Sequence, residues 1–163
     1  MAEKQVKGFI RMNKFLIVTC LAISLSACKD DSVNPLNDFF PPVQVNLMIN
    51  LSLPTSAPLI IPQGFIYEQG GNRGIIIYRT IANEYVAYDR TCPYNVNEPC
   101  SYISVDSSLT FFRCGQYNPA FTPCCGSKFD PATGTNVSGP ATRGLKPYFV
   151  RQEGNLLYVT NNP

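Results

Sequence analysis

The stretch Pro123-Cys-Cys-Gly-Ser-Lys-Phe-Asp130 (PCCGSKFD) places two cysteines side by side ahead of a Gly-Ser pair. A disulfide between adjacent cysteines strains the peptide unit that joins them. Cys124 and Cys125 are therefore expected to have different partners. The identity of those partners decides whether this part of the chain carries a metal site or a set of disulfides.

The composition of the 163-residue chain is typical of many short strands joined by turns. It contains fourteen Pro, eleven Gly, ten Phe and nine Tyr, and only 15% of its residues are charged. With 45% hydrophobic residues, it can bury one ordinary core. A net charge of +2 gives no basis for a nucleic-acid surface. The chain contains no His, which excludes an imidazole base and an imidazole metal ligand.

The first part of the chain has the features of a secretory signal. Met12–Cys28 (MNKFLIVTCLAISLSAC) has a basic start, an apolar run and an end of small residues. Residues 1–27 are interpreted as a signal peptide, with Met12 as a candidate true start. The end Leu25-Ser-Ala-Cys28 resembles the lipobox of bacterial lipoproteins, in which the cysteine is acylated. This resemblance implies that Cys28 carries a lipid anchor that holds the protein at a membrane.

The residues that follow Cys28 are polar. Lys29-Asp30-Asp31 resembles the signal that exports lipoproteins to the cell surface in some Gram-negative bacteria. We expect an outer-membrane lipoprotein, and exposure at the cell surface is a further hypothesis. Residues 28–42 are interpreted as the lipidated cysteine and a polar linker, and residues 43–163 as one domain.

Strand-like patterns fill residues 43–163. Apolar and polar residues alternate over residues 43–53, which predicts a half-buried strand that ends at Pro54. Gly64–Glu68 and Ile75–Arg79 flank a glycine-rich turn and predict a hairpin. Further strands are predicted at residues 84–89, 102–105, 109–112, 145–150 and 155–160. This domain has no sustained helical period, so the prediction is a single antiparallel all-β domain.

Five of the seven cysteines lie in this domain. Cys20 lies in the signal and Cys28 is the expected lipid site. The other five are clustered within about thirty-four residues: Cys92, Cys100, Cys114, Cys124 and Cys125. Because five is odd, at least one of these cysteines is free, bound to a metal or paired outside the chain.

Three segments of the domain resemble the Rieske iron–sulfur family. They are Ala87–Tyr94 (AYDRTCPY), Cys125–Asp130 (CGSKFD) and Ser138–Tyr148 (SGPATRGLKPY). In that family one loop carries Cys-x-His and a second carries Cys-Pro-Cys-His-Gly-Ser-x-Phe. The resemblance covers roughly residues 58 to 160. It implies a Rieske-like fold of stacked antiparallel sheets, with the two cluster loops at one tip.

This chain differs from the Rieske family at most of the ligand positions. A Rieske cluster has two thiolates on one iron and two imidazoles on the other. Cys92 matches the first cysteine ligand, but Tyr94 stands at the first His position. Thr122 stands at the second cysteine position, and Cys125 stands at the second His position. An authentic Rieske centre is therefore not expected on this chain alone.

The same resemblance implies a disulfide arrangement. Cys124 stands where many Rieske proteins have a disulfide cysteine, and Cys100 lies in the loop that supplies its partner. Cys125 would then face Cys92 across the position of the cluster. We expect the disulfides Cys100–Cys124 and Cys92–Cys125, with Cys114 as the odd thiol. Each bridge would contribute about 2–4 kcal/mol to stability.

Two other hypotheses for the cysteines remain open. In the first, thiolates bind zinc or an all-cysteine [2Fe–2S] cluster. Its named ligands are Cys92 and Cys125. Cys100 and Cys124 complete the set of four, and Cys114 is a further candidate ligand. In the second, an exposed cysteine pair exchanges disulfides with a partner.

No other catalytic grouping is found, and an enzyme is not favoured. The sequence predicts a cell-envelope lipoprotein with a Rieske-like domain without His ligands, acting as a disulfide-stabilised binding or structural module with no cofactor. The alternative is an electron-transfer protein with a [2Fe–2S] cluster or zinc on cysteine ligands. Its expected partners are the membrane, through the lipid anchor, and a protein or ligand that the sequence does not identify. No nucleic-acid partner is expected.

Overall fold

The computed structural model describes residues 40–163, which all belong to one compact unit, Asn34–Pro163. The expectations for the signal peptide (residues 1–27), for Cys28 and for most of the linker fall outside the described residues. None of the helices within residues 40–163 combines the length and apolarity needed to cross a membrane.

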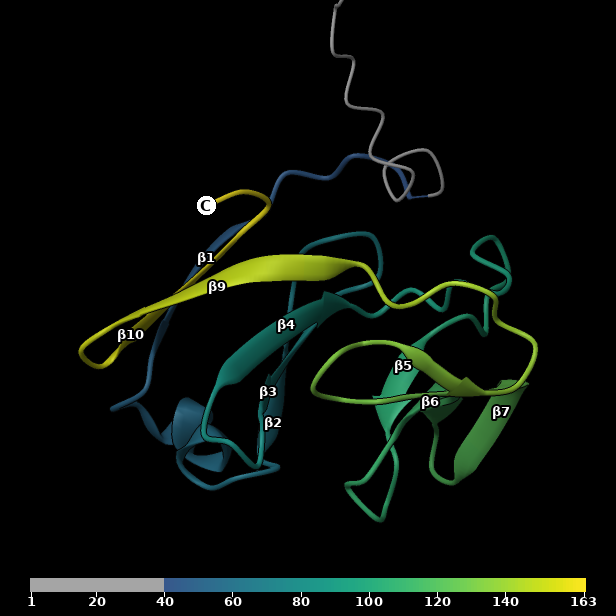
Figure 1. Ribbon diagram of the computed structural model, residues 1–163, viewed down its shortest axis with the longest axis horizontal. Coiled ribbons are helices and arrows are strands. Elements are labelled where there is room, and N and C mark those ends of the chain that lie inside the picture. The colour runs from purple at the N-terminus through teal and green to yellow at the C-terminus, as the bar shows by residue number, and fades with distance from the viewer. Residues whose placement is uncertain (1–39) are drawn as a thin grey trace, which may run out of the picture. The chain divides into compact units, whose positions relative to one another are not determined.

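Residues 40–163 form ten strands and one short 3-10 helix arranged in two antiparallel sheets. In chain order the elements are β1 (Asn46–Asn50), η1 (Pro54–Ile60), β2 (Phe65–Glu68), β3 (Ile75–Arg79), β4 (Tyr85–Asp89), β5 (Ile103–Val105), β6 (Phe112–Tyr117), β7 (Phe121–Phe129), β8 (Asn136–Ser138), β9 (Pro147–Glu153) and β10 (Leu156–Thr160). One sheet has the order β1-β10-β9-β4-β3-β2, and the other has the order β5-β6-β7-β8. Figure 1 shows β5, β6 and β7 at the opposite end of this unit from β1 and β10. The predicted all-β fold is confirmed.

Strand β3 lies between two hydrophobic cores. Its residues Ile75, Ile76 and Ile77 are each fully buried, as expected for a β-branched run in the interior of a sheet. Because side chains alternate across a strand, Ile75 and Ile77 pack into one core and Ile76 packs into the other. The second of these cores contains Phe112 and Phe129 of the four-stranded sheet. Burial on both faces of β3 therefore connects the six-stranded sheet to the sheet that carries the cysteines.

The predicted hairpin is present, and the strands predicted at residues 145–150 and 155–160 form a second one. Phe65 pairs with Tyr78 in the β2–β3 hairpin, and Leu156 pairs with Glu153 in the β9–β10 hairpin. The strand predicted over residues 43–53 is shorter, because β1 ends at Asn50 and η1 follows.

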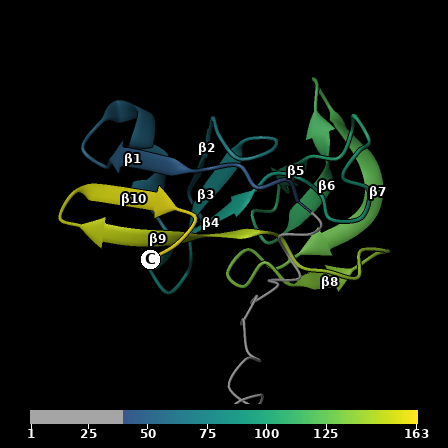
Figure 2. The ribbon, with the colours of Figure 1, turned by 90° about the horizontal axis from the view of Figure 1, so that it is seen from above.

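The four-stranded sheet differs most from the prediction. The strand expected at residues 109–112 begins only at Phe112, because Asp106 accepts hydrogen bonds from the backbone N–H groups of Ser108 and Leu109 in a turn. Leu109 has a positive φ of 59°, which is incompatible with a strand. Strands β7 and β8 were not predicted. Figure 2 shows β7 beside β6, and β8 pairs with β7 at the edge of this sheet.

Candidate functional site

Strands β6 and β7 pair on both sides of a large bulge. Arg113 pairs with Lys128, and two residues further along β6, Gly115 pairs with Pro123. Cys114 therefore lies opposite four residues of β7, 124–127. Extra residues in one strand interrupt the hydrogen-bond ladder and increase its bend. The bulge gives the adjacent cysteines of the PCCGSKFD stretch room to face different partners.

The end of β4 places Cys92 beside Cys114. Thr91 forms an isolated bridge with Tyr102, and the Cys92 N–H donates to the Ser101 carbonyl at 3.0 Å. Ile103, the next residue of β5, pairs with Cys114 of β6. Both cysteines are buried in one core and form a disulfide, with Cα atoms 5.7 Å apart. This separation lies within the usual range for a disulfide.

A second disulfide joins Cys100 to Cys124, the pair that the family resemblance implies. Their Cα atoms lie 5.3 Å apart. The loop that contains Cys100 is also held by Arg73, whose guanidinium donates to the Val96 and Pro99 carbonyls at 3.0 and 3.2 Å. This loop is therefore attached to the bulge by a covalent bond and to the β2–β3 hairpin by hydrogen bonds.

The prediction of a disulfide between Cys92 and Cys125 is wrong. Cys92 is paired with Cys114, and Cys125 is the free thiol among the described residues. The sequence left Cys114 as the odd thiol, whereas the structure places it on β6 next to β5, within reach of Cys92. The alternation of Phe112 and Cys114 on the buried face of β6 is the signal that would have found this pair.

Three sulfur atoms nevertheless meet at this site. The Sγ atoms of Cys92, Cys114 and Cys125 lie within 4.8 Å of one another, and we call this group the sulfur trio. The Sγ atoms of Cys92 and Cys125 are 3.7 Å apart. The Cys125 thiol donates to Ser127 Oγ at 3.2 Å, and the same oxygen accepts the Ala141 N–H at 3.0 Å.

The loop after β8 covers the bulge at close range. Gly139 has a positive φ of 93°, and a Cβ at this position would collide with the backbone of Gly126 and Ser127. A residue other than glycine would therefore be opposed by both its own backbone conformation and the backbone beneath it. This close approach keeps Ala141 at hydrogen-bonding distance from Ser127.

The residues at the four ligand positions do not fit a Rieske cluster. Cys92 is bonded to Cys114, and Tyr94 and Thr122 are exposed to solvent outside the sulfur trio. The chain also has no His to supply the imidazoles. The cysteine ligands named for the metal hypothesis, Cys92 and Cys125, are brought together, with Cys114 as the third member.

A buried carboxylate fixes the backbone just before Cys92. Asp89 is fully buried and accepts hydrogen bonds from the Asn72 N–H at 2.7 Å and from the Tyr148 hydroxyl at 2.8 Å. It also accepts from both the backbone N–H and the hydroxyl of Thr91, at 2.9 and 2.6 Å. Burial and then the Asp89 charge raise the pKa of Tyr148, so this hydroxyl stays protonated and donates. Sequence reasoning missed this network, because Asp89 and Tyr148 are 59 residues apart.

Solved structures with a similar fold are Rieske proteins. The quaternary ammonium Rieske monooxygenase CntA matches with a TM-score of 0.51 and 13% identity, over 77% of this chain and 33% of that chain. The cyanobacterial plasma membrane Rieske protein PetC3 from Synechocystis PCC 6803 matches with a TM-score of 0.49 and 24% identity, over 68% and 97% of the two chains. The ferredoxin of carbazole 1,9a-dioxygenase from Nocardioides aromaticivorans IC177 matches with a TM-score of 0.46 and 13% identity, over 74% and 100%.

No protein-family model and no curated protein matches the chain. At these sequence identities, the likeness to CntA concerns the fold alone. The predicted Rieske-like fold is confirmed, and the function must be argued from the residues of this chain.

Proposed function

We propose that this protein is a lipid-anchored envelope protein whose Rieske-like domain is a disulfide-stabilised binding module without an iron–sulfur cluster. The observation that carries the proposal is the disulfide between Cys92 and Cys114. Cys92 is the one residue that matches a Rieske ligand, and a cysteine in a disulfide does not supply the thiolate that iron requires.

The two disulfides stabilise the cysteine-containing loops in the absence of a cluster. Their cysteines are separated by 22 and 24 residues in the sequence. In the chain-entropy model, a bridge over a loop of this length contributes about 3.5 kcal/mol by restricting the unfolded chain. Disulfides persist outside the cytosol, which agrees with the proposed location in the envelope.

The anchor is the lipid expected at Cys28, and the tether ends before Phe40, because this side chain is buried in the folded domain. Lys29-Asp30-Asp31 supports an outer-membrane protein that faces the cell exterior. Incorporation of labelled palmitate, with Cys28→Ser as the control, tests the anchor. Proteolysis of intact cells tests the orientation, because a protein that survives this treatment untouched contradicts surface exposure.

A second candidate function rests on the sulfur trio. After reduction of the Cys92–Cys114 bridge, three thiolates would lie within 4.8 Å of one another. Three thiolates would leave one position of a tetrahedral zinc ion open. An all-cysteine [2Fe–2S] cluster needs a fourth thiolate, and this would require breaking the Cys100–Cys124 bridge as well.

Metal content distinguishes the two candidates. The full chain is purified from membranes without reductant, and iron, zinc and acid-labile sulfide are measured per polypeptide. A Rieske ferredoxin expressed in the same host controls for metal supply. We expect substoichiometric iron and zinc. Stoichiometric metal that Cys125→Ser removes would overturn the cluster-free module and establish the second candidate.

A further inference from the structure

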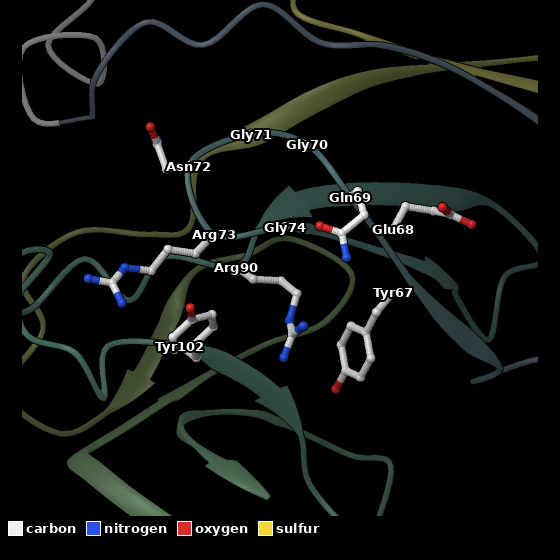
Figure 3. Close-up of a pocket in the computed structure, with 10 residues that line it drawn as sticks. All are labelled: Tyr67, Glu68, Gln69, Gly70, Gly71, Asn72, Arg73, Gly74, Arg90 and Tyr102. Atoms are coloured by element: carbon white, nitrogen blue, oxygen red, sulfur yellow. The ribbon is translucent and has the colours of Figure 1, made fainter.

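A cavity of about 430 Å³ lies where the β2–β3 hairpin meets the segment between β4 and β5. Its walls are Tyr67, residues 68–74, Arg90 and Tyr102 (Figure 3). The volume lies within the range of about 300–1,000 Å³ that is usual for small-molecule sites. The sulfur trio contributes no residue to these walls. The cavity is therefore a separate candidate binding site.

Arg90 carries an unneutralised charge in this cavity. Among the described residues, the ion pairs are Arg113–Asp106 and Arg151–Glu153, so no carboxylate pairs with Arg90. Its Nε donates to the Ile103 carbonyl at 3.0 Å, and its two terminal nitrogens have no acceptor in the described part of the chain. Burial lowers the pKa of Arg90, and the neighbouring tyrosines offset part of this effect. A partly buried cation without a counterion favours an anionic ligand.

The guanidinium of Arg90 is held in a fixed position. Its Cζ lies 3.7 Å from the centroid of the Tyr67 ring and 5.7 Å from that of Tyr102. The Tyr67 hydroxyl accepts the Val105 N–H at 3.0 Å, which fixes that ring in turn. Stacking and the Ile103 hydrogen bond orient the planar group before any ligand arrives. Preorganisation reduces the entropy cost of binding.

The other charged side chains around the cavity do not compete for this position. In Figure 3 the Glu68 carboxylate points away from Arg90, and the Gln69 amide points towards the space beside it. Arg73 extends past Tyr102, and its guanidinium donates to the loop carbonyls of Val96 and Pro99. Arg90 is therefore the cation that a ligand in this cavity would meet.

We propose that the cavity binds a small hydroxylated carboxylate of the acidic-sugar type, with its carboxylate on the two terminal nitrogens of Arg90. Planar carboxylates match the guanidinium fork in a bidentate pair. The Gln69 amide, the Tyr102 hydroxyl and the backbone of residues 70–74 line the remaining space and supply partners for hydroxyl groups. This inference rests on the proposed binding function and names the ligand class of the module.

The test uses the oxidised full chain in detergent and D-glucuronate as the probe, with D-glucose as the neutral control. Calorimetric titration should show that glucuronate binds at least about tenfold more tightly than glucose. Arg90→Lys keeps the charge but removes the fork, so it should weaken glucuronate binding by about tenfold or more. Arg151→Gln, a change at an exposed arginine of β9, is the matched control and should leave the affinity within about twofold.

Hydrogen–deuterium exchange of the wild-type protein locates the bound probe without any variant. Protection should appear at residues 67–74 and 90–103, and Gln69→Ala should weaken binding if Arg90→Lys does not fold. No binding, equal binding of glucose, or protection elsewhere would overturn the inference. These outcomes are independent of the metal content. If the protein is metal-free and does not bind glucuronate, only this inference is refuted. If the protein contains stoichiometric metal, the cluster-free module is refuted.

Discussion

Removing Cys114 should redirect the disulfide of Cys92 to Cys125. The Cys125 sulfur lies 3.7 Å from that of Cys92, so an approach of about 1.7 Å brings it to bonding distance. Cys114→Ala should therefore contain a Cys92–Cys125 bridge. In Cys125→Ala the original Cys92–Cys114 bridge should remain. Only the double variant, which combines Cys114→Ala with Cys125→Ala, lacks a partner for Cys92.

The expected magnitudes follow from the lengths of the loops. The chain-entropy model gives about 3.4 kcal/mol for the Cys92–Cys114 bridge, with a separation of 22 residues. It gives about 3.8 kcal/mol for the redirected bridge, with a separation of 33 residues. The redirected bridge thus compensates for the lost one. Cys114→Ala should therefore lower the free energy of unfolding by only about 1–2 kcal/mol, because of the cavity that it leaves at a buried position. The double variant should lose about 3–4 kcal/mol beyond the sum of the two single variants.

Urea unfolding of the four oxidised proteins, followed by circular dichroism, measures this coupling. Free-thiol counts under acid quench should give one thiol in the wild type, none in each single variant and one in the double variant. Peptide mapping after digestion at low pH should identify the bridge in Cys114→Ala. Additive losses, or two free thiols in Cys114→Ala, would refute the argument that Cys125 lies within reach of Cys92.

Three further predictions concern the groups that support the site. Tyr148→Phe removes one donor from the buried Asp89 carboxylate and should lower the free energy of unfolding by about 1–3 kcal/mol in urea titrations; no change would show that this bond is dispensable. Burial and then Asp130 raise the pKa of Tyr88 to about 12. The unfolded chain therefore loses this proton first, so stability should be full below pH 10 and should fall between pH 10 and 12. Melting temperatures over this range should fall less in Tyr88→Phe, and an equal fall would exclude Tyr88 as a cause. Gly139→Ala should destabilise the protein more than Gly154→Ala, because both glycines have a positive φ but only Gly139 lies against backbone; equal losses in urea would contradict the steric argument.

The sequence predicted those strands and hairpins whose residue patterns lie within one short segment. The β2–β3 hairpin has a β-branched run and a glycine-rich turn, and β1 lies in a segment that alternates apolar and polar residues, so each pattern is complete within a few residues. Strand β7 has no such pattern, because Pro123 and the adjacent cysteines interrupt it. It exists because residues on both sides of a bulge pair with β6. The residue pattern of one segment does not indicate which other segment it pairs with.

The candidate site was predicted in part for the same reason. Spacing identified the cysteines and, through the family resemblance, the pair Cys100 and Cys124. It did not identify the partner of Cys92, because this depends on which face of β6 carries Cys114. The Arg90 cavity was also missed, since its walls come from segments that only the folded chain brings together.

The intact native mass of the exported protein, measured before and after reduction, shows whether the domain carries a cluster or two disulfides. We expect a polypeptide without bound metal whose mass rises by four hydrogens on reduction, two for each disulfide. A native mass increased by two irons and two sulfides, or by one zinc, together with no gain of hydrogens at Cys92 and Cys114, would contradict this expectation.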